Sequence, residues 1–297
     1  MHQRSSLVFL VVLWLVSGPL FAAESLPEWP RRDELLPASA RIVQGRLENG
    51  MRYAIYPLTK ATGQVSLRLL VDAGSLQERD EERGYAHFVE HMAFNGTRHF
   101  PSGELVKALQ REGVGFGPHV NAHTFIRQTS YEIDLTQNTP ERLALGLRIL
   151  RDFSDGILFE PREVKRERGV ILSEDVARHT PEQILDRQRT EFLFAGTRTA
   201  ERWPLGAAEP IERARPEALR AFYEAWYRPE RICVAIAGDV SVADVEAQVR
   251  EHFASMVARG EPRPEPAPGK VPKLENPEVT CREESRAGLE VVAAFVR

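Results

Sequence analysis

Alternating apolar and polar positions mark the strands of this chain. Residues 41–56 alternate on either side of Asn49-Gly50, a dipeptide that favours a tight hairpin turn, and so predict two paired strands. Short apolar or alternating runs predict further strands at residues 64–73, 120–123, 130–135 and 232–237. Strands are thus expected from one end of residues 41–258 to the other.

Apolar residues recur at helical spacing between these strands. The pattern predicts helices at residues 81–94, 103–112, 140–153, 161–177, 216–227 and 242–257. A further helix is expected to start at Thr180-Pro181, because Thr180 can cap it and Pro181 fits its first turn. Helices interspersed with strands over residues 41–258 indicate one complete α/β domain.

A proline-rich stretch follows this domain. Pro262, Pro264, Pro266, Pro268 and Pro272 predict an extended linker over residues 259–278. Residues 279–297 are strand-like again, but the apolar strand at 289–296 has no visible partner in the sequence. We therefore expect residues 279–297 to be the truncated start of a second, similar domain, in a shortened gene product or a fragment.

The first 23 residues have the pattern of a secretory signal peptide. An unbroken apolar run at residues 7–16 is ended by Ser17-Gly18-Pro19, and Ala22-Ala23 supplies small residues for cleavage. The run is too short for a comfortable membrane span, although a retained single-span anchor is the alternative. We expect a periplasmic or secreted protein without a stable membrane span, in which residues 24–40 form a polar lead segment.

Charge and cysteine content narrow the picture further. The formal net charge of −4 over 297 residues, with no long run of either sign, argues against nucleic acid as a partner. Cys233 and Cys281 are the two cysteines, so the fold does not depend on a disulfide framework. Cys233 lies in an apolar run and is interpreted as a small buried residue. A Cys233–Cys281 bridge is left open.

The sequence His87-Phe88-Val89-Glu90-His91 places two imidazoles and a carboxylate within five residues. In a helix, residues i and i+4 share a face, so His87 and His91 would hold one divalent metal ion from the same side. Glu90 would lie beside them, placed to take a proton from a water on that metal. This H-x-x-E-H order is the inverse of H-E-x-x-H and indicates metal-assisted hydrolysis, with a chance pattern on a core helix as the alternative.

Two histidines need a third ligand, because catalytic zinc commonly takes three protein ligands and leaves one position for water. The best candidates are Glu167 and Glu174, two turns apart on the predicted helix 161–177 and on the stripe of Val170 and Ile171. Acidic residues that share a helix stripe with apolar ones indicate a buried face on which the carboxylates have a functional role. A solvated helix with scattered charge explains the spacing alone equally well.

Five stretches of the sequence resemble motifs of one known family and occur in the same order as in that family. They are residues 84–97 around the H-x-x-E-H motif, residues 121–124 (Asn-Ala-His-Thr), residues 167–174 (E-R-x-V-x-x-x-E), residues 222–229 (F-Y-x-x-W-Y-x-P) and residues 237–240, which contain Gly-Asp-Val. Together they resemble the insulinase/pitrilysin family of inverted-motif zinc peptidases. The match covers most of residues 41–257, which argues against a chance motif.

The resemblance implies a fold and a set of roles. The fold would be α+β, a two-layer domain with a mostly antiparallel sheet packed by helices, as in one half of such a metallopeptidase. His87, His91 and Glu174 would bind one zinc ion per chain, and Glu90 would be the general base. Glu167 would be a carboxylate that tunes a ligand or the base. The implied activity is zinc-dependent endopeptidase hydrolysis of peptides or unfolded segments.

Asn121 and Ala122 match the substrate-side strand of the family. An exposed strand edge can accept a peptide as an extra strand, and the resemblance implies that Asn121 and Ala122 bind substrate in this way. Asn121 would also hydrogen-bond a substrate carbonyl. Without the resemblance, Asn121 is better interpreted as a turn residue.

Members of the family pair two related domains into a chamber, and the resemblance implies that the second half supplies Arg and Tyr groups that bind peptide and stabilise the oxyanion. We expect this chain to end before those residues. A partner subunit or a missing C-terminal half would supply them. The alternative function is therefore a non-catalytic or half-site subunit that needs a partner chain. Such subunits normally lose a ligand or the base, and neither is lost here, which favours the peptidase.

Overall fold

The computed structural model describes residues 39, 41–58, 60, 63–115, 117–178, 180–273, 278–286 and 289–296. The chain divides into two units, residues 1–39 and 40–297. The predicted signal peptide (1–23) and almost all of the predicted lead segment (24–40) lie outside the described residues. Within the described part, no helix is both long and apolar enough to cross a membrane.

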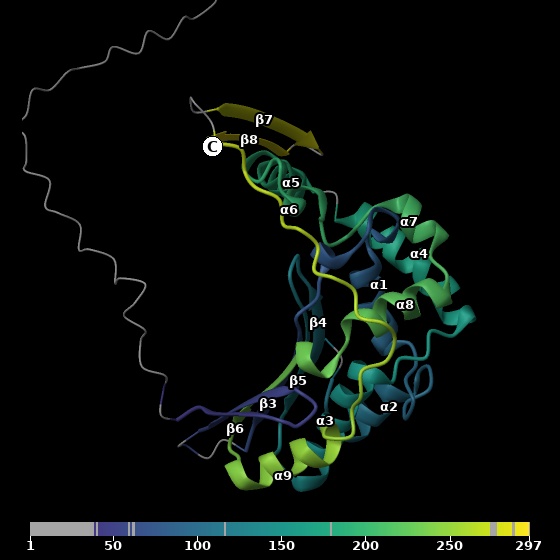
Figure 1. The fold of residues 1–297 in the computed structure, drawn as a ribbon, viewed down its shortest axis with the longest axis vertical. Coiled ribbons are helices and arrows are strands. Elements are labelled where there is room, and N and C mark those ends of the chain that lie inside the picture. Colours follow the sequence, from purple (N-terminus) through teal and green to yellow (C-terminus); the bar gives the residue numbers. More distant parts are fainter. Residues whose placement is uncertain are drawn as a thin grey trace, which may run out of the picture. The chain divides into compact units, whose positions relative to one another are not determined.

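A six-stranded sheet forms the centre of the second unit (Figure 1). In spatial order its strands are β1 (Val43–Arg46), β2 (Arg52–Pro57), β6 (Ile232–Gly238), β3 (Val65–Val71), β5 (Thr129–Leu135) and β4 (Val120–Thr124). Every neighbouring pair is antiparallel except β2 and β6, so the mostly antiparallel sheet is confirmed. Because β4 comes last in this order, no described strand pairs with its outer edge.

The predicted hairpin joins β1 to β2 through residues 47–51. Gly50 has a φ of +92°, a conformation that glycine adopts without the steric cost of a Cβ. The Asn49 side chain donates to the carbonyl oxygens of Phe253 (2.8 Å) and Met256 (3.0 Å). The turn therefore also holds the end of the last helix of the domain.

Helices lie on one side of the sheet (Figure 1). On this side α1 (Tyr85–Phe94), α3 (Pro140–Asp155) and α9 (Val242–Phe253) contact strands, and α8 (Pro216–Trp226) contacts α1. Burial alternates along the strands: in β3, Leu67 and Leu69 are fully buried whereas Ser66 and Arg68 are half-buried. The strands thus bury one set of side chains under the helices and present the other set on an open face.

The remaining helices are α2 (Glu104–Arg111), α4 (Pro161–Ala177), α5 (Pro181–Leu193), α6 (Arg198–Glu201) and α7 (Ala208–Arg213), with single 3-10 turns at Ser75–Gln77, Asp80–Glu82 and Pro229–Arg231. The helix expected from residue 81 begins at Tyr85 instead, because Gly84 takes a φ of +102°. The helix start predicted at Thr180-Pro181 is confirmed, and Thr180 accepts a hydrogen bond from the Gln183 backbone. The short α6 and α7 have no sequence-based prediction.

Aromatic residues of α8 fill the core between helices and sheet. Phe222, Tyr223 and Trp226, together with Tyr227 directly after the helix, are at most 2% exposed and belong to the core. The hydroxyl groups of Tyr227 and Tyr131 lie 2.8 Å apart, which satisfies two buried polar atoms with one hydrogen bond.

The proline-rich linker has neither helix nor strand over residues 259–268, as its composition predicts, but it is not a free spacer. Arg263 contacts both carboxylate oxygens of Glu82 at 2.8 Å, and Pro268 accepts a hydrogen bond from the Arg198 backbone. Further along the chain, β7 (Val279–Arg286) pairs antiparallel with β8 (Leu289–Val296). The expectation that the last apolar strand has no partner is therefore wrong.

Candidate metal centre

Helix α1 carries both histidines and Glu90 against the core. Its N-cap is Gly84, where an added Cβ would lie 2.9 Å from the Ile211 side chain, so the close packing of the helix start requires glycine. His87 and Glu90 are buried among apolar neighbours such as Phe88 and Val89. The H-x-x-E-H motif therefore lies on a helix that packs into the core, and its apolar residues Phe88 and Val89 are buried there.

The buried side chain of Glu78 fixes the start of this helix. Its two carboxylate oxygens accept hydrogen bonds from the backbone N–H groups of Gly84 (2.9 Å) and Ala86 (2.8 Å). These are donors that a helix N-terminus leaves without intrahelical partners. Burial raises the pKa of Glu78 to about 8, and the two backbone donors and Arg202 act in the opposite direction.

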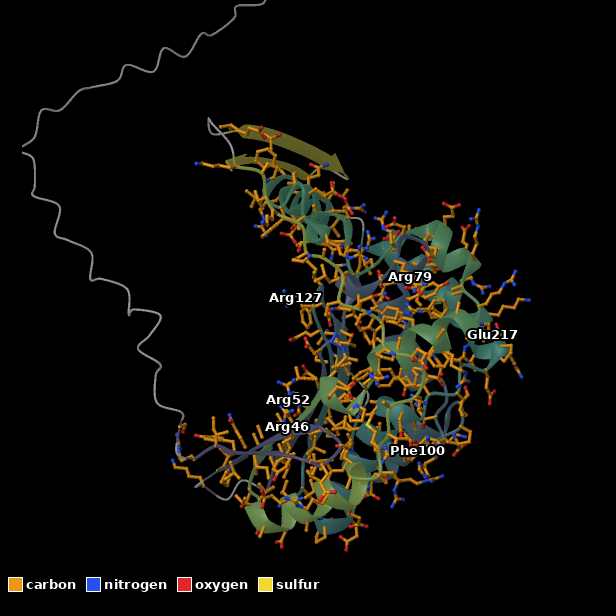
Figure 2. The ribbon with its side chains drawn as sticks, in the orientation of Figure 1. Arg46, Arg52, Arg79, Phe100, Arg127 and Glu217 are labelled. Atoms are coloured by element: carbon orange, nitrogen blue, oxygen red, sulfur yellow. The ribbon has the colours of Figure 1, made fainter. Side chains whose placement is uncertain are left out.

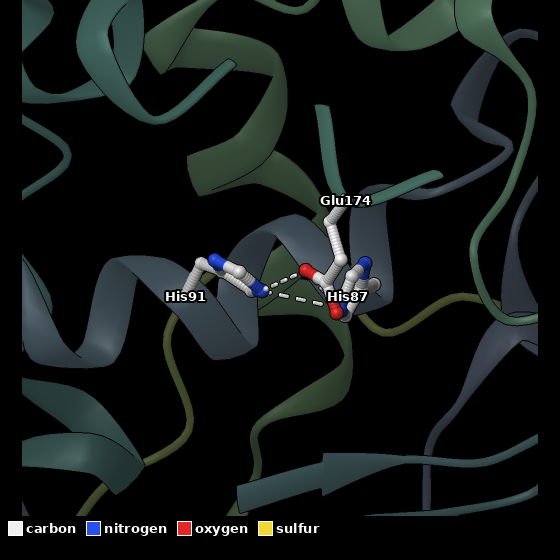
Figure 3. Close-up of side chains that lie close together, drawn as sticks. All are labelled: His87, His91 and Glu174. Atoms are coloured by element: carbon white, nitrogen blue, oxygen red, sulfur yellow. Dashed lines mark hydrogen bonds and ion pairs between the residues drawn. The ribbon is translucent and has the colours of Figure 1, made fainter. Parts of the chain in front are cut away.

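Helix α4 contacts α1 and brings two carboxylates to the histidines, Glu167 and Glu174, of which Figure 3 shows Glu174. Glu174 Oε2 lies 3.3 Å from His91 Nε2 and 3.7 Å from His87 Nε2, and the two Nε2 atoms are 3.1 Å apart. Two helical turns before Glu174, Glu167 Oε1 lies 2.7 Å from His91 Nδ1. The buried stripe of α4 contains Glu167 and Ile171, as expected from the sequence, whereas Val170 is 47% exposed.

The three donor groups fit a zinc ion. Ligand atoms of His87, His91 and Glu174 all lie within 4.8 Å of one another, and they form a metal-binding group among the described residues. Zinc bonds of about 2.0–2.1 Å at tetrahedral angles put neighbouring ligand atoms about 3.3 Å apart, close to the three separations found here. Two imidazole nitrogens and one carboxylate leave a fourth position open, as catalytic zinc sites do.

The electrostatics of the centre differ between the two histidines. Burial, together with His91, lowers the pKa of His87 to about 3, so His87 is a neutral imidazole with a free lone pair. Burial would also lower the pKa of His91, but hydrogen bonds to Glu167 and Glu174 outweigh it and raise that pKa to about 9. The His91 hydrogen bond lowers the pKa of Glu174 to about 2 despite partial burial. A metal ion would therefore displace a proton from His91, because only neutral histidine is a ligand.

Glu90 lies beside the metal ligands and is held by a residue of β4. The hydroxyl of Thr124 donates to Glu90 Oε2 over 2.7 Å. Burial raises the pKa of Glu90, and the Thr124 hydrogen bond partly lowers it. A carboxylate with a raised pKa beside a metal site is suited to take up a proton near neutral pH.

The edge strand β4 borders the same site. His119 O accepts from Asp134 N and Phe125 N donates to Gln128 O, so the odd-numbered residues bond to β5 and the even-numbered backbone groups point to the free edge. Ala122 N–H points there and donates to the Asn121 side chain at 2.9 Å. Asn121 is exposed in a strand, and the alternative of a turn residue is wrong.

A cavity of about 1000 Å³ joins the metal ligands, Glu90 and β4. Beyond the residues expected from the sequence, its lining includes Arg178, Trp203 and Leu205. Arg178 also forms an ion pair with Glu174. Sequence reasoning missed these residues, because none belongs to a spaced motif and each reaches the cavity through tertiary packing.

Comparison with known families agrees with this geometry. Residues 54–202 match the family model described as "Insulinase (Peptidase family M16)", and residues 213–295 match "Peptidase M16 inactive domain". The chain belongs to the insulinase family of peptidases. The fold expected from the family resemblance, a helix-packed sheet of one M16 half, is therefore confirmed.

Relatives within the insulinase family are longer than this chain. The chain is 35% identical to the "Probable zinc protease PqqL" of Escherichia coli over 258 residues, which are 87% of this chain and 26% of that protein. It is 31% identical to the "Zinc protease PQQL-like" of Arabidopsis thaliana, over 82% of this chain and 25% of that protein. The crystal structure of the first half of the Escherichia coli periplasmic protease PqqL aligns with a TM-score of 0.73 and 36% identity, covering 78% of this chain and 50% of that one. The chain thus spans about a quarter of the curated relatives.

Proposed function

We propose that this chain carries the catalytic centre of a zinc-dependent endopeptidase that hydrolyses peptides or unfolded segments. The observation that carries the proposal is the convergence of His87, His91 and Glu174 on one point, with Glu90 beside them. Three of these four groups come from α1 and one from α4, so the constellation depends on the fold and not on the motif alone. The relatives named zinc proteases support the same reaction class.

His87 Nε2, His91 Nε2 and a Glu174 carboxylate oxygen would hold one zinc ion per chain. When bound, zinc supplies Lewis acidity, which makes water acidic enough to be a nucleophile near neutral pH and polarises a carbonyl group. Glu167 orients His91 by accepting the Nδ1 proton, which leaves Nε2 as the ligand atom. Arg178 restrains Glu174 from the solvent side.

Glu90 acts as the general base in this proposal. Thr124 occupies Oε2, which leaves Oε1 to take the proton of the attacking water. The protonated carboxyl then delivers this proton to the nitrogen of the leaving amine. The raised pKa of Glu90 favours both steps, because a base that holds its proton near neutral pH can also act as the acid.

Substrate binds to the outer edge of β4 in this proposal. An added peptide strand would pair with the backbone of Ala122 and extend past Thr124, which holds the base. The hydrogen bond between Asn121 Oδ1 and Ala122 N–H would break, and the Asn121 amide would become available to a substrate carbonyl. Affinity from backbone pairing carries only modest sequence preference, which suits unfolded segments.

The second candidate is a half-site subunit that needs a partner chain or a C-terminal half to complete the chamber. The chain covers 26% and 25% of the length of two relatives named zinc proteases, so a C-terminal half is part of those proteins. A solved structure of E. coli PqqL is described as a periplasmic protease, and we propose a periplasmic or secreted location for this chain. Peptide substrate is the partner in both candidates.

Cleavage of a fluorogenic peptide by zinc-loaded protein tests the proposal. We expect turnover that chelation abolishes and that zinc restores, and loss of at least a hundredfold in Glu90→Gln, since general-base catalysis contributes roughly 10²–10⁴-fold. Activity unchanged in Glu90→Gln would refute the proposed mechanism. Zinc binding with cleavage only after addition of a C-terminal half would select the half-site candidate.

A further inference from the structure

The strand register aligns a row of side chains across the open face of the sheet. Arg46 lies opposite Arg52, Arg52 beside Cys233, Cys233 beside Leu70, Leu70 beside Ser130, and Ser130 beside His123. Because facing residues of paired strands point to the same side, this row runs continuously from β1 to β4. His123 is at its end in the cavity of the metal centre.

The other end of the row places two like charges directly opposite each other. Cross-strand partners have Cβ atoms about 4.5–5.5 Å apart, and like charges at that separation destabilise the pair. Both arginines are exposed, and Figure 2 shows them near the strands and away from Phe100 and Glu217 on the helical side. The repulsion between Arg46 and Arg52 therefore destabilises the folded chain, and no ion pair with a described residue offsets it.

Neither Arg46 nor Arg52 forms an ion pair with a described residue, whereas Arg68 on the same face does. Arg68 lies 2.8 Å from Asp134 and 3.5 Å from Glu132, so its charge is balanced. Between the arginines and the cavity the row offers small or apolar groups: Cys233 and Leu70 are half-buried. Cys233 thus lies half-buried on the open face, and the interpretation of Cys233 as a small buried residue is wrong.

We propose that Arg46 and Arg52 form a docking point for an acidic segment of the peptide substrate, at a distance from the bond that is cut. This inference rests on the proposed peptidase function. Two guanidinium groups on directly opposite residues of paired strands match one or two carboxylates, and a bound anion would remove the repulsion between them. Leu70 and Cys233 would carry apolar side chains of the same segment.

The row fixes the spacing of the docking point. Arg52 is four and Arg46 five strand-to-strand steps from His123, which at about 4.8 Å per step are about 19 Å and about 24 Å. An extended chain covers about 3.3 Å per residue, so an acidic residue must follow or precede the cut by about six to seven residues or more. Short peptides would be cut without using the pair, and longer acidic peptides would bind better.

Binding of two labelled peptides to the full chain tests the proposal independently of turnover. Each peptide has about 16 residues, an apolar half for the cavity and, about eight residues away, either four glutamates or four glutamines. Fluorescence anisotropy with the zinc-loaded Glu90→Gln protein measures both dissociation constants. We expect the glutamate peptide to bind about three- to tenfold more tightly at low salt, with the preference shrinking as ionic strength rises.

The variant Arg46→Gln/Arg52→Gln should lose this preference while binding the glutamine peptide unchanged. The control variant Arg111→Gln/Arg162→Gln loses the same net charge at exposed positions of α2 and α4. This control should still prefer the glutamate peptide. The Arg46→Gln/Arg52→Gln protein should unfold at an equal or higher temperature, which separates docking from loss of fold. Equal affinity for both peptides, or a preference that survives in Arg46→Gln/Arg52→Gln, would overturn the proposal. Self-association that depends on this pair, without peptide preference, would overturn it too by assigning the face to a second copy.

If wild-type protein prefers the glutamate peptide but cuts neither peptide, the docking point stands and the proposed catalytic function fails. If it cuts both peptides with equal KM values, the catalytic function stands and the docking point fails. Placing the glutamates two residues from the apolar half gives a further control, because they would not reach the pair and the preference should vanish.

Discussion

His91 Nδ1 and Glu167 Oε1 lie 2.7 Å apart, which couples one imidazole of the proposed metal site to a buried carboxylate of α4. In the proposed centre this contact would set the tautomer that presents Nε2 to the metal. In Glu167→Gln the shape is kept but the charged acceptor is lost. We expect zinc affinity to fall by about 10–100-fold, because partners of this kind contribute that much to metal binding.

Competition with a chelator of known affinity measures this change. Glu160→Gln is the matched control, since Glu160 is an exposed glutamate at the start of the same helix and makes no side-chain cap hydrogen bond. Equal zinc affinity in Glu167→Gln and Glu160→Gln would show that Glu167 does not support the ligand.

Thr124→Val should move the acid limb of the pH–rate profile upward. The Thr124 hydrogen bond stabilises ionised Glu90, and burial already raises the pKa of that group. Loss of a hydrogen bond to a charged group is worth about 1.5–3 kcal/mol, which corresponds to about one to two pH units. Zinc affinity should stay the same, because Thr124 does not contact a ligand in this structure. An unshifted acid limb would mean that Glu90 is not the titrating base.

Glu78→Gln should change how stability depends on pH. Burial raises the pKa of Glu78 to about 8, so between pH 4.5 and 8 the folded chain keeps a proton that the unfolded chain releases. The free energy of unfolding therefore falls as pH rises through this window, by up to about 5 kcal/mol for this one group. Glu78→Gln removes that contribution, so its stability relative to wild type should rise from pH 5 to pH 8.

Urea unfolding at several pH values provides this comparison, with the exposed Glu212→Gln as control. A stability difference between Glu78→Gln and wild type that does not change from pH 5 to pH 8 would contradict the expectation. It would mean that the N–H groups of Gly84 and Ala86 keep Glu78 ionised at the start of α1.

The elements with a long periodic pattern could be predicted from the sequence. The hairpin around Asn49-Gly50 and the helix beginning at Pro181 follow local rules of turns and caps, and both are present. The helices α6 and α7 were missed because four and six residues are too few to show a period. The pairing of β7 with β8 was missed because apolar content shows that a strand exists but not which strand it joins.

The centre itself was only partly accessible to sequence reasoning. The spacing of His87 and His91 predicts one shared face, since both lie on one helix. Glu174 comes from a different helix, and its spacing alone left a solvated surface as an equal alternative until the family resemblance was considered. Glu78 carries no motif, and Thr124 lies in a matched stretch without an assigned role, because both act through contacts made only when distant segments pack together.

The most direct test of the account is the identity of the atoms around bound zinc. X-ray absorption at the zinc edge, combined with a crystal structure of the zinc-loaded chain, should show one ion bound by the Nε2 atoms of His87 and His91 and a carboxylate oxygen of Glu174, with Glu90 unbound beside it. Zinc bound elsewhere, or a zinc shell unchanged in Glu174→Ala, would contradict it.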